Sequence, residues 1–97
     1  MSGAAEGGPR SRAFVIVNEL GLHARAATKL VQLAGRFHAE VELENDGQRA
    51  NAKSVMGVLL LCGSRGTTVT VHASGADAEA ALGAIGALIE SGFGEAS

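Results

Sequence analysis

The sequence predicts an α+β fold in which three helices lie on one face of a four-stranded, mostly antiparallel sheet. Segments with the two-residue period of strands and segments with the helical period follow each other in the order β-α-β-β-α-β-α. The 97 residues are 46% apolar and 19% charged, which is typical of a chain that buries a core. At this length we expect a single domain.

The four expected strands are short segments that are β-branched or alternate between apolar and polar residues. Residues 13–17 form an apolar run, residues 39–44 and 68–72 alternate, and residues 48–52 follow a turn. That turn is Asn45-Asp46-Gly47, whose residues tolerate the positive φ of tight hairpins. Three glutamates alternate with the apolar residues of 39–44, so we expect one wet, acidic face on this strand.

The three expected helices span about residues 24–35, 54–60 and 78–89. Ser54 and Asp77 are placed to cap the second and third of them. Gly83 and Gly86 lie inside the last helix, where each costs roughly 1 kcal/mol against alanine. They are tolerable there if they permit close contact between this helix and the sheet.

Composition and charge exclude several classes of function. The net charge of −2 argues against a nucleic-acid binder, which would usually carry a basic stripe. The longest apolar run, Val58–Cys62, is far shorter than the ~20 residues of a membrane span. The single cysteine, Cys62, excludes an internal disulfide and suits a reducing compartment, and we expect it to be buried because it follows three leucines. A cytoplasmic protein is predicted, with residues 1–11 as a disordered extension and residues 12–97 as the domain.

One motif, Gly-Leu-His-Ala-Arg at residues 21–25, places a histidine where a turn enters a helix. The first helical turn has unpaired N–H groups and partial positive charge, so it is a ready anion site. Arg25 could set its planar donors against a phosphate, while His23 supplies a nucleophilic nitrogen. The combination suits a transient phosphohistidine. On spacing alone, a solvated histidine that precedes a helix remains the alternative.

A second motif, Lys-Ser-Val-Met-Gly-Val at residues 53–58, starts the short helix. A helix this small must expose some of its apolar side chains, so a patch with Met56 indicates an interaction surface, with core packing as the alternative. The three histidines, His23, His38 and His72, lack compact metal-ligand spacing, which disfavours a zinc site.

Both motifs, at their spacing, resemble the HPr family, the histidine-containing phosphocarriers of the bacterial phosphoenolpyruvate-dependent phosphotransferase system. Residues 21–25 resemble its active-site signature, residues 53–58 its serine-phosphorylation signature, and residues 73–77 the segment before its last helix. The resemblance covers residues 13–94 and implies an open-faced β-sandwich. It also implies a phosphoryl relay, in which enzyme I phosphorylates His23 on Nδ1 and the group passes to an enzyme IIA, and it implies an HPr kinase/phosphorylase that acts on Ser54. Such a protein is a carrier and not an enzyme, and the resemblance implies no cofactor.

Two positions depart from the family pattern: Ala26 stands where proline is usual, and Leu20 stands where many members carry an Asn or Ser able to bond the histidine ring. We expect the chain to be a monomer that docks its partners through an apolar patch. The residues of the expected patch are Leu22, Ala24, Val55, Met56 and Val58. Three alternatives stay open: a phosphocarrier of a nitrogen-related branch, a regulatory binding protein controlled at Ser54, and an α/β interaction domain without phosphorylation.

Overall fold

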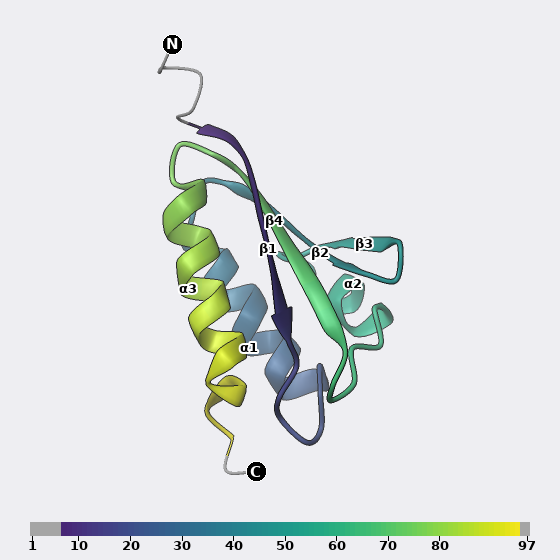
Figure 1. Ribbon diagram of the computed structural model, residues 1–97. Coiled ribbons are helices and arrows are strands. Elements are labelled where there is room, and N and C mark those ends of the chain that lie inside the picture. Colours follow the sequence, from purple (N-terminus) through teal and green to yellow (C-terminus); the bar gives the residue numbers. More distant parts are fainter. Residues whose placement is uncertain (1–6, 96–97) are drawn as a thin grey trace.

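The computed structural model describes residues 7–95, and within them the predicted α+β fold is confirmed (Figure 1). The strands are β1 (Gly7–Val15), β2 (Glu40–Asn45), β3 (Gln48–Asn51) and β4 (Thr68–Gly75). The helices are α1 (Ala24–Ala34), α2 (Val55–Leu60) and α3 (Ala78–Glu90), followed by a 3-10 turn, η2 (Gly92–Gly94). The strand order in the sheet is β1-β4-β2-β3, and all neighbours are antiparallel.

The sheet has one covered and one open face because its strands alternate buried and exposed side chains. In β4, Val69 and Val71 are fully buried, whereas His72, the residue after Val71, points to the other face of the sheet. Figure 1 shows α1 behind the sheet, α3 to the left of β1 and α2 near β3, and α1 and α3 contact each other. No helix within residues 7–95 covers the opposite face. This arrangement is the open-faced sandwich that the resemblance implies.

The first strand is longer at its start than the sequence predicts. Residues 7–11, expected to belong to a disordered extension, are part of β1, and residues 10–12 pair with residues 71–73 of β4, so this part of the prediction is wrong. The sequence of this segment has no apolar period because its side chains do not enter the core. Arg10 and Arg12 instead form ion pairs with the carboxylate oxygens of Glu79 on α3, at 3.7 and 3.6 Å. Pro9 is tolerated because β1 is an edge strand. Residues 1–6 lie outside the described residues.

The local turn and cap predictions around β3 are confirmed. Asp46 and Gly47 have φ of 54° and 82°, so the hairpin uses two positive-φ residues, as the Asn-Asp-Gly sequence predicts. Ser54 is the N-cap of α2, and its Oγ accepts a hydrogen bond from the Gly57 N–H at 3.1 Å.

Asp77 stands at the N-cap position of α3 but does not cap it, so its predicted role is wrong. Its two carboxylate oxygens accept hydrogen bonds from the N–H groups of His38 and Ala39, at 2.8 and 2.7 Å. These bonds, with that of His38 first, hold the pKa of Asp77 below its ordinary value. The carboxylate therefore ties the start of α3 to the chain entering β2.

The two glycines inside α3 have different surroundings. A Cβ at Gly86 would lie 2.3 Å from Cζ of Phe14, so the close approach of helix to strand requires glycine there. A Cβ at Gly83 would meet nothing within 4 Å. Gly86 thus permits a close contact between helix and sheet, whereas Gly83 does not serve that purpose.

Cys62 was expected in the core, but it is exposed and has a φ of 55°. The expectation fails because α2 ends at Leu60. The turn that follows directs Leu61 into the core and leaves Cys62 at the surface. The long apolar run is thus divided between the core and the surface. Within residues 7–95, no helix combines the length and apolarity that crossing a membrane requires.

Candidate functional site

His23 is the N-cap residue of α1, with an extended backbone and a side chain that is 25% exposed. Its Nδ1 accepts a hydrogen bond from the Arg25 N–H at 3.2 Å, which makes the ring itself the cap of the helix. The nitrogen therefore points at the helix N-terminus, where unpaired N–H groups favour an anion.

A tight turn fixes the backbone just before His23. Gly21 has a φ of +65°, and a Cβ there would lie 2.3 Å from the Gly63 carbonyl oxygen. The N–H of Leu22 donates to that same oxygen at 2.7 Å. The Gly21 position thus requires glycine both for its conformation and for space.

The second ring nitrogen of His23 faces a carboxylate from the other end of the chain. Nε2 donates to Oε2 of Glu95, 72 residues away in sequence. Oε1 of the same carboxylate accepts from Nδ2 of the buried Asn18 at 3.0 Å, and this amide also donates to the Gly21 carbonyl at 2.8 Å. The hydrogen bond from His23, followed by that from Asn18, lowers the pKa of Glu95.

These partners define the tautomer of the His23 ring. An ionised carboxylate only accepts hydrogen bonds, so Nε2 must carry the proton in the neutral ring. Nδ1 then has a free lone pair, which agrees with its role as acceptor for the Arg25 N–H. The arrangement leaves the available lone pair of the neutral ring on Nδ1.

The tail that carries Glu95 is held in an uncommon backbone conformation. Gly92, Phe93 and Gly94 all have positive φ, at 68°, 59° and 72°. The Phe93 side chain is fully buried, and its carbonyl accepts from Nζ of Lys29 at 2.7 Å. The carboxylate of Glu95 is therefore placed by an anchored turn and not by a free end.

A family model described as "PTS HPr component phosphorylation site" matches residues 10–91, which is most of the chain. The chain belongs to the HPr family. Membership of the HPr family makes it a phosphocarrier of the phosphotransferase system and not an enzyme.

Individual HPr-family relatives cover nearly the whole domain. The chain is 48% identical to the phosphocarrier protein HPr of Cupriavidus necator over 84 residues, 87% of this chain and 94% of that one. It is 50% identical to the phosphocarrier protein NPr of Shewanella violacea over 86 residues, 89% of this chain and 94% of that one. The crystal structure of HPr-C-His from Thermoanaerobacter tengcongensis superposes with a TM-score of 0.87 at 42% identity, covering 91% of this chain and 99% of that one.

The expected partner patch of this HPr-family chain is only partly at the surface. Ala24 and Met56 are exposed, and Val55 is half-buried against the core. Val58 is fully buried, so its predicted role in docking is wrong. Leu22 is 5% exposed, so only a small part of its side chain is available to a partner. The short helix turns Val58 inward and leaves Met56 outside.

Other apolar side chains that sequence reasoning did not place in the patch are exposed instead. Leu20 and Leu60 are each 69% exposed, comparable with Met56 at 66%. Leu20 also lines a shallow hollow of about 180 Å³ together with His23 and Cys62. Leu20 has no side-chain group that could hydrogen-bond the His23 ring, and the ring bonds Glu95.

Sequence reasoning also missed Glu95 and Asn18. No local pattern connects either residue to His23, because the hydrogen bonds join the loop after β1 to the turn after α3. The available signal is the Gly92-Phe93-Gly94 segment, since an aromatic residue between two glycines after a helix indicates an anchored sharp turn.

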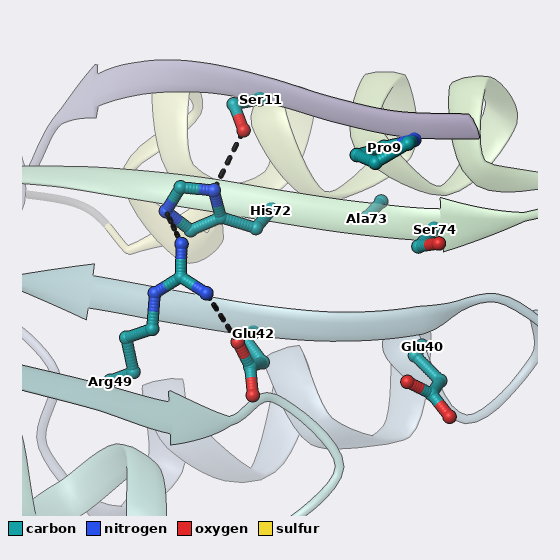
Figure 2. A pocket seen from close by; sticks show the side chains of 8 residues that line it. All are labelled: Pro9, Ser11, Glu40, Glu42, Arg49, His72, Ala73 and Ser74. Atoms are coloured by element: carbon teal, nitrogen blue, oxygen red, sulfur yellow. Dashed lines mark hydrogen bonds and ion pairs between the residues drawn. The ribbon is translucent and has the colours of Figure 1, made fainter. Parts of the chain in front are cut away.

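His72 lies on the open face of the sheet, and both of its ring nitrogens have partners (Figure 2). Nδ1 is 2.7 Å from Ser11 Oγ on β1, and Nε2 is 2.7 Å from Glu44 on β2 and 3.1 Å from Arg49 on β3. The four side chains come one from each strand, so His72 links the sheet across its width. His38 is exposed and does not join either group.

Proposed function

We propose that His23 accepts a phosphoryl group on Nδ1 from phosphorylated enzyme I and passes it to an enzyme IIA. The observation that carries this proposal is that the two ring nitrogens have different hydrogen-bond partners. Nε2 carries the proton and donates it in a hydrogen bond to Glu95, whereas Nδ1 keeps its lone pair at the N-terminus of α1. The arrangement supports attack by Nδ1 and disfavours attack by Nε2.

The first turn of α1 also supplies the electrostatics for the phosphorylated state. A phosphoryl group on Nδ1 replaces the hydrogen bond from Arg25 N–H and brings its oxygens to the helix-end amides. The exposed Arg25 side chain can then place a bidentate donor pair against those oxygens. We assign Arg25 the role of stabilising the charge that moves during transfer.

We assign partner docking to the exposed apolar side chains around this turn and on α2. They are Leu20, Ala24, Met56 and Leu60. Ser54 caps the same helix and is half-buried, so a phosphate there lies at the border of the proposed docking surface. We infer that phosphorylation of Ser54 regulates which partners bind. We place the relay in the cytoplasm, whose reducing conditions suit a chain with one exposed thiol.

The deciding experiment is labelling with enzyme I and radioactive phosphoenolpyruvate. Wild type should take up an acid-labile, base-stable label, and His23→Ala should take up none while keeping its fold. His38→Ala and His72→Ala are the matched controls and should label fully. A label that persists in His23→Ala, or that disappears only in His72→Ala, overturns the assignment of His23.

A second candidate is a phosphocarrier of a nitrogen-related branch, and the 50% identity to an NPr favours keeping it. Both candidates use the same His23 chemistry and differ only in the receiving enzyme IIA. Transfer from phosphorylated chain to a sugar-branch and a nitrogen-branch enzyme IIA, measured side by side, separates them.

A further inference from the structure

The carboxylate of Glu95 is held in position more firmly than that of an ordinary exposed glutamate. It is only 14% exposed at its side chain, each of its oxygens has a donor, and the turn before it has three positive-φ residues in a row. Phe93 is an L-residue with a side chain, so its left-handed conformation is unfavourable and must be held by the packing around it. Backbone strain of this kind commonly accompanies functional positions.

The chemistry of phosphoryl transfer shows what such a carboxylate can do. When the group leaves His23, the bond between phosphorus and Nδ1 breaks, its electron pair returns to Nδ1, and the phosphoryl group goes to the partner's nucleophile. If Nε2 holds its proton throughout, the leaving group is neutral imidazole. If Nε2 has lost it, the leaving group is imidazolate, a far stronger base and a far poorer leaving group. The rate of transfer therefore depends on the proton at Nε2.

We propose that Glu95 is a positioning residue that keeps the proton on Nε2 of His23 through both halves of the relay, and this inference rests on the proposed function of His23. In the accepting half, the carboxylate fixes the tautomer that exposes the Nδ1 lone pair and stabilises the positive charge the ring gains as it attacks. In the donating half, the same contact leaves neutral imidazole behind. A carboxylate that orients a histidine in this way is known from hydrolytic triads.

Asn18 makes the proposal specific enough to test with one substitution. Its Nδ2 group donates to Oε1 of Glu95, and the same Nδ2 also donates to Gly21 O, so the side chain has a fixed direction. In Glu95→Gln, the amide oxygen should stay opposite Asn18, and the NH₂ group should face the ring. An NH₂ group donates to Nε2 and favours the ring proton on Nδ1, which then gives up its hydrogen bond from the Arg25 N–H. The substitution keeps the shape of the site and reverses its tautomer.

The first measurement uses the unphosphorylated chain and ¹⁵N NMR of the His23 ring at mildly alkaline pH. Wild type and the control Glu90→Gln, which neutralises an exposed acid at the end of α3, should show protonated Nε2. Glu95→Gln should show protonated Nδ1, and Glu95→Ala a mixture of both forms. A ring that keeps its proton on Nε2 in Glu95→Gln overturns the proposal.

The second measurement follows loss of phosphate to water by ³¹P NMR, after loading with phosphoramidate so that no partner protein is needed. Release from Glu95→Gln should be at least about tenfold slower than from wild type, by analogy with the up to ~10⁴-fold cost of reversing the tautomer in a triad. Glu90→Gln should match wild type. Equal release from Glu95→Gln and wild type overturns the role of Glu95. Failure of enzyme I to label wild type, with the tautomer reversal still seen, instead counts against the proposed function.

Discussion

Each ring nitrogen of His23 meets a different part of the molecule. Nδ1 meets the backbone of its own helix, two residues along the chain, and Nε2 meets Glu95 in the turn after α3. The short-range contact places Nδ1 at helix-end amides that favour an anion, and the long-range contact holds the proton on Nε2 and so leaves the lone pair on Nδ1. Chemistry at this residue therefore depends on both the local sequence and the packing of the tail.

Arg25 is expected to matter for transfer and not for stability, because its side chain is exposed and its proposed partner is the phosphoryl group. Arg25→Ala should slow single-turnover phosphorylation of His23 by about 10²-fold, by analogy with the removal of a single hydrogen-bond donor from an oxyanion hole. Arg25→Lys should recover only part of the rate, since an ammonium is a point charge.

Arg36→Ala is the matched control for this experiment, because Arg36 is exposed just beyond the opposite end of α1. It should leave the rate unchanged, and the unfolding free energies of all three variants should stay close to that of wild type. A wild-type rate in Arg25→Ala would remove Arg25 from the proposed mechanism.

At the scale of the elements, α3 offers a pair of identical substitutions with opposite expected signs. Gly83→Ala should raise the free energy of unfolding by about 0.5–1 kcal/mol, because the position is open and alanine is the better helix former. Gly86→Ala should lower it by about 1–3 kcal/mol, because the methyl group would collide with the Phe14 ring. Urea denaturation of both variants measures the difference. Equal shifts in the two would contradict the packing of α3 on β1.

The hydrogen bonds of Asp77 predict that the stability of the contact between α3 and the chain before β2 depends on pH. The hydrogen bonds from His38 and Ala39 lower the pKa of Asp77 below 3.8 in the folded state, so the folded form binds its proton less readily than the unfolded one. The stabilisation is then fully present above the unfolded pKa and is lost as the pH falls through the folded one.

Asp77→Asn should therefore lower the free energy of unfolding at neutral pH, and its difference from wild type should shrink as the solution is acidified below about pH 4. Denaturant unfolding at several pH values measures this. Asp46→Asn, at the exposed hairpin turn, is the control and should show no such trend. A difference for Asp77→Asn that is constant from neutral to acid pH would exclude the charge of Asp77 as the cause.

At the scale of the whole molecule, His23 and Ser54 begin two helices that contact each other, and we place both beside the proposed docking surface. A phosphate on Ser54 adds roughly −1.5 to −2 charges at the start of α2, where the helix end tolerates them. A partner that covers this surface must instead desolvate them, which costs several kcal/mol for an unpaired charge. Modification at Ser54 should therefore weaken the docking of enzyme I without unfolding the chain.

Ser54→Asp is the partial mimic, and it should slow His23 phosphorylation by enzyme I about tenfold at low enzyme I concentration, corresponding to ~1.4 kcal/mol of lost binding. Ser54→Ala should accept phosphate at the wild-type rate. The two variants separate docking from folding, since Asp still caps α2 whereas Ala loses the cap and about 1 kcal/mol of stability. Equal rates for Asp and Ala variants at every enzyme I concentration would show that charge at Ser54 does not gate the relay.

The sequence alone determined the features that depend on neighbours along the chain. The hairpin at Asp46-Gly47, the cap at Ser54 and the position of His23 at the start of α1 all follow from residues within one turn of each other. The element order also follows, because the period of apolar residues is a local property of the backbone.

Only the tertiary structure decided which distant residues meet. It brought Glu95 to both His23 and Asn18, turned Asp77 from its own helix to the chain before β2, and extended β1 over residues 7–11 through pairing with β4. It also buried Leu22 and Val58 while it exposed Leu20 and Cys62. The physical reason is that a period fixes the face of an element, whereas its neighbours depend on how all the elements pack together.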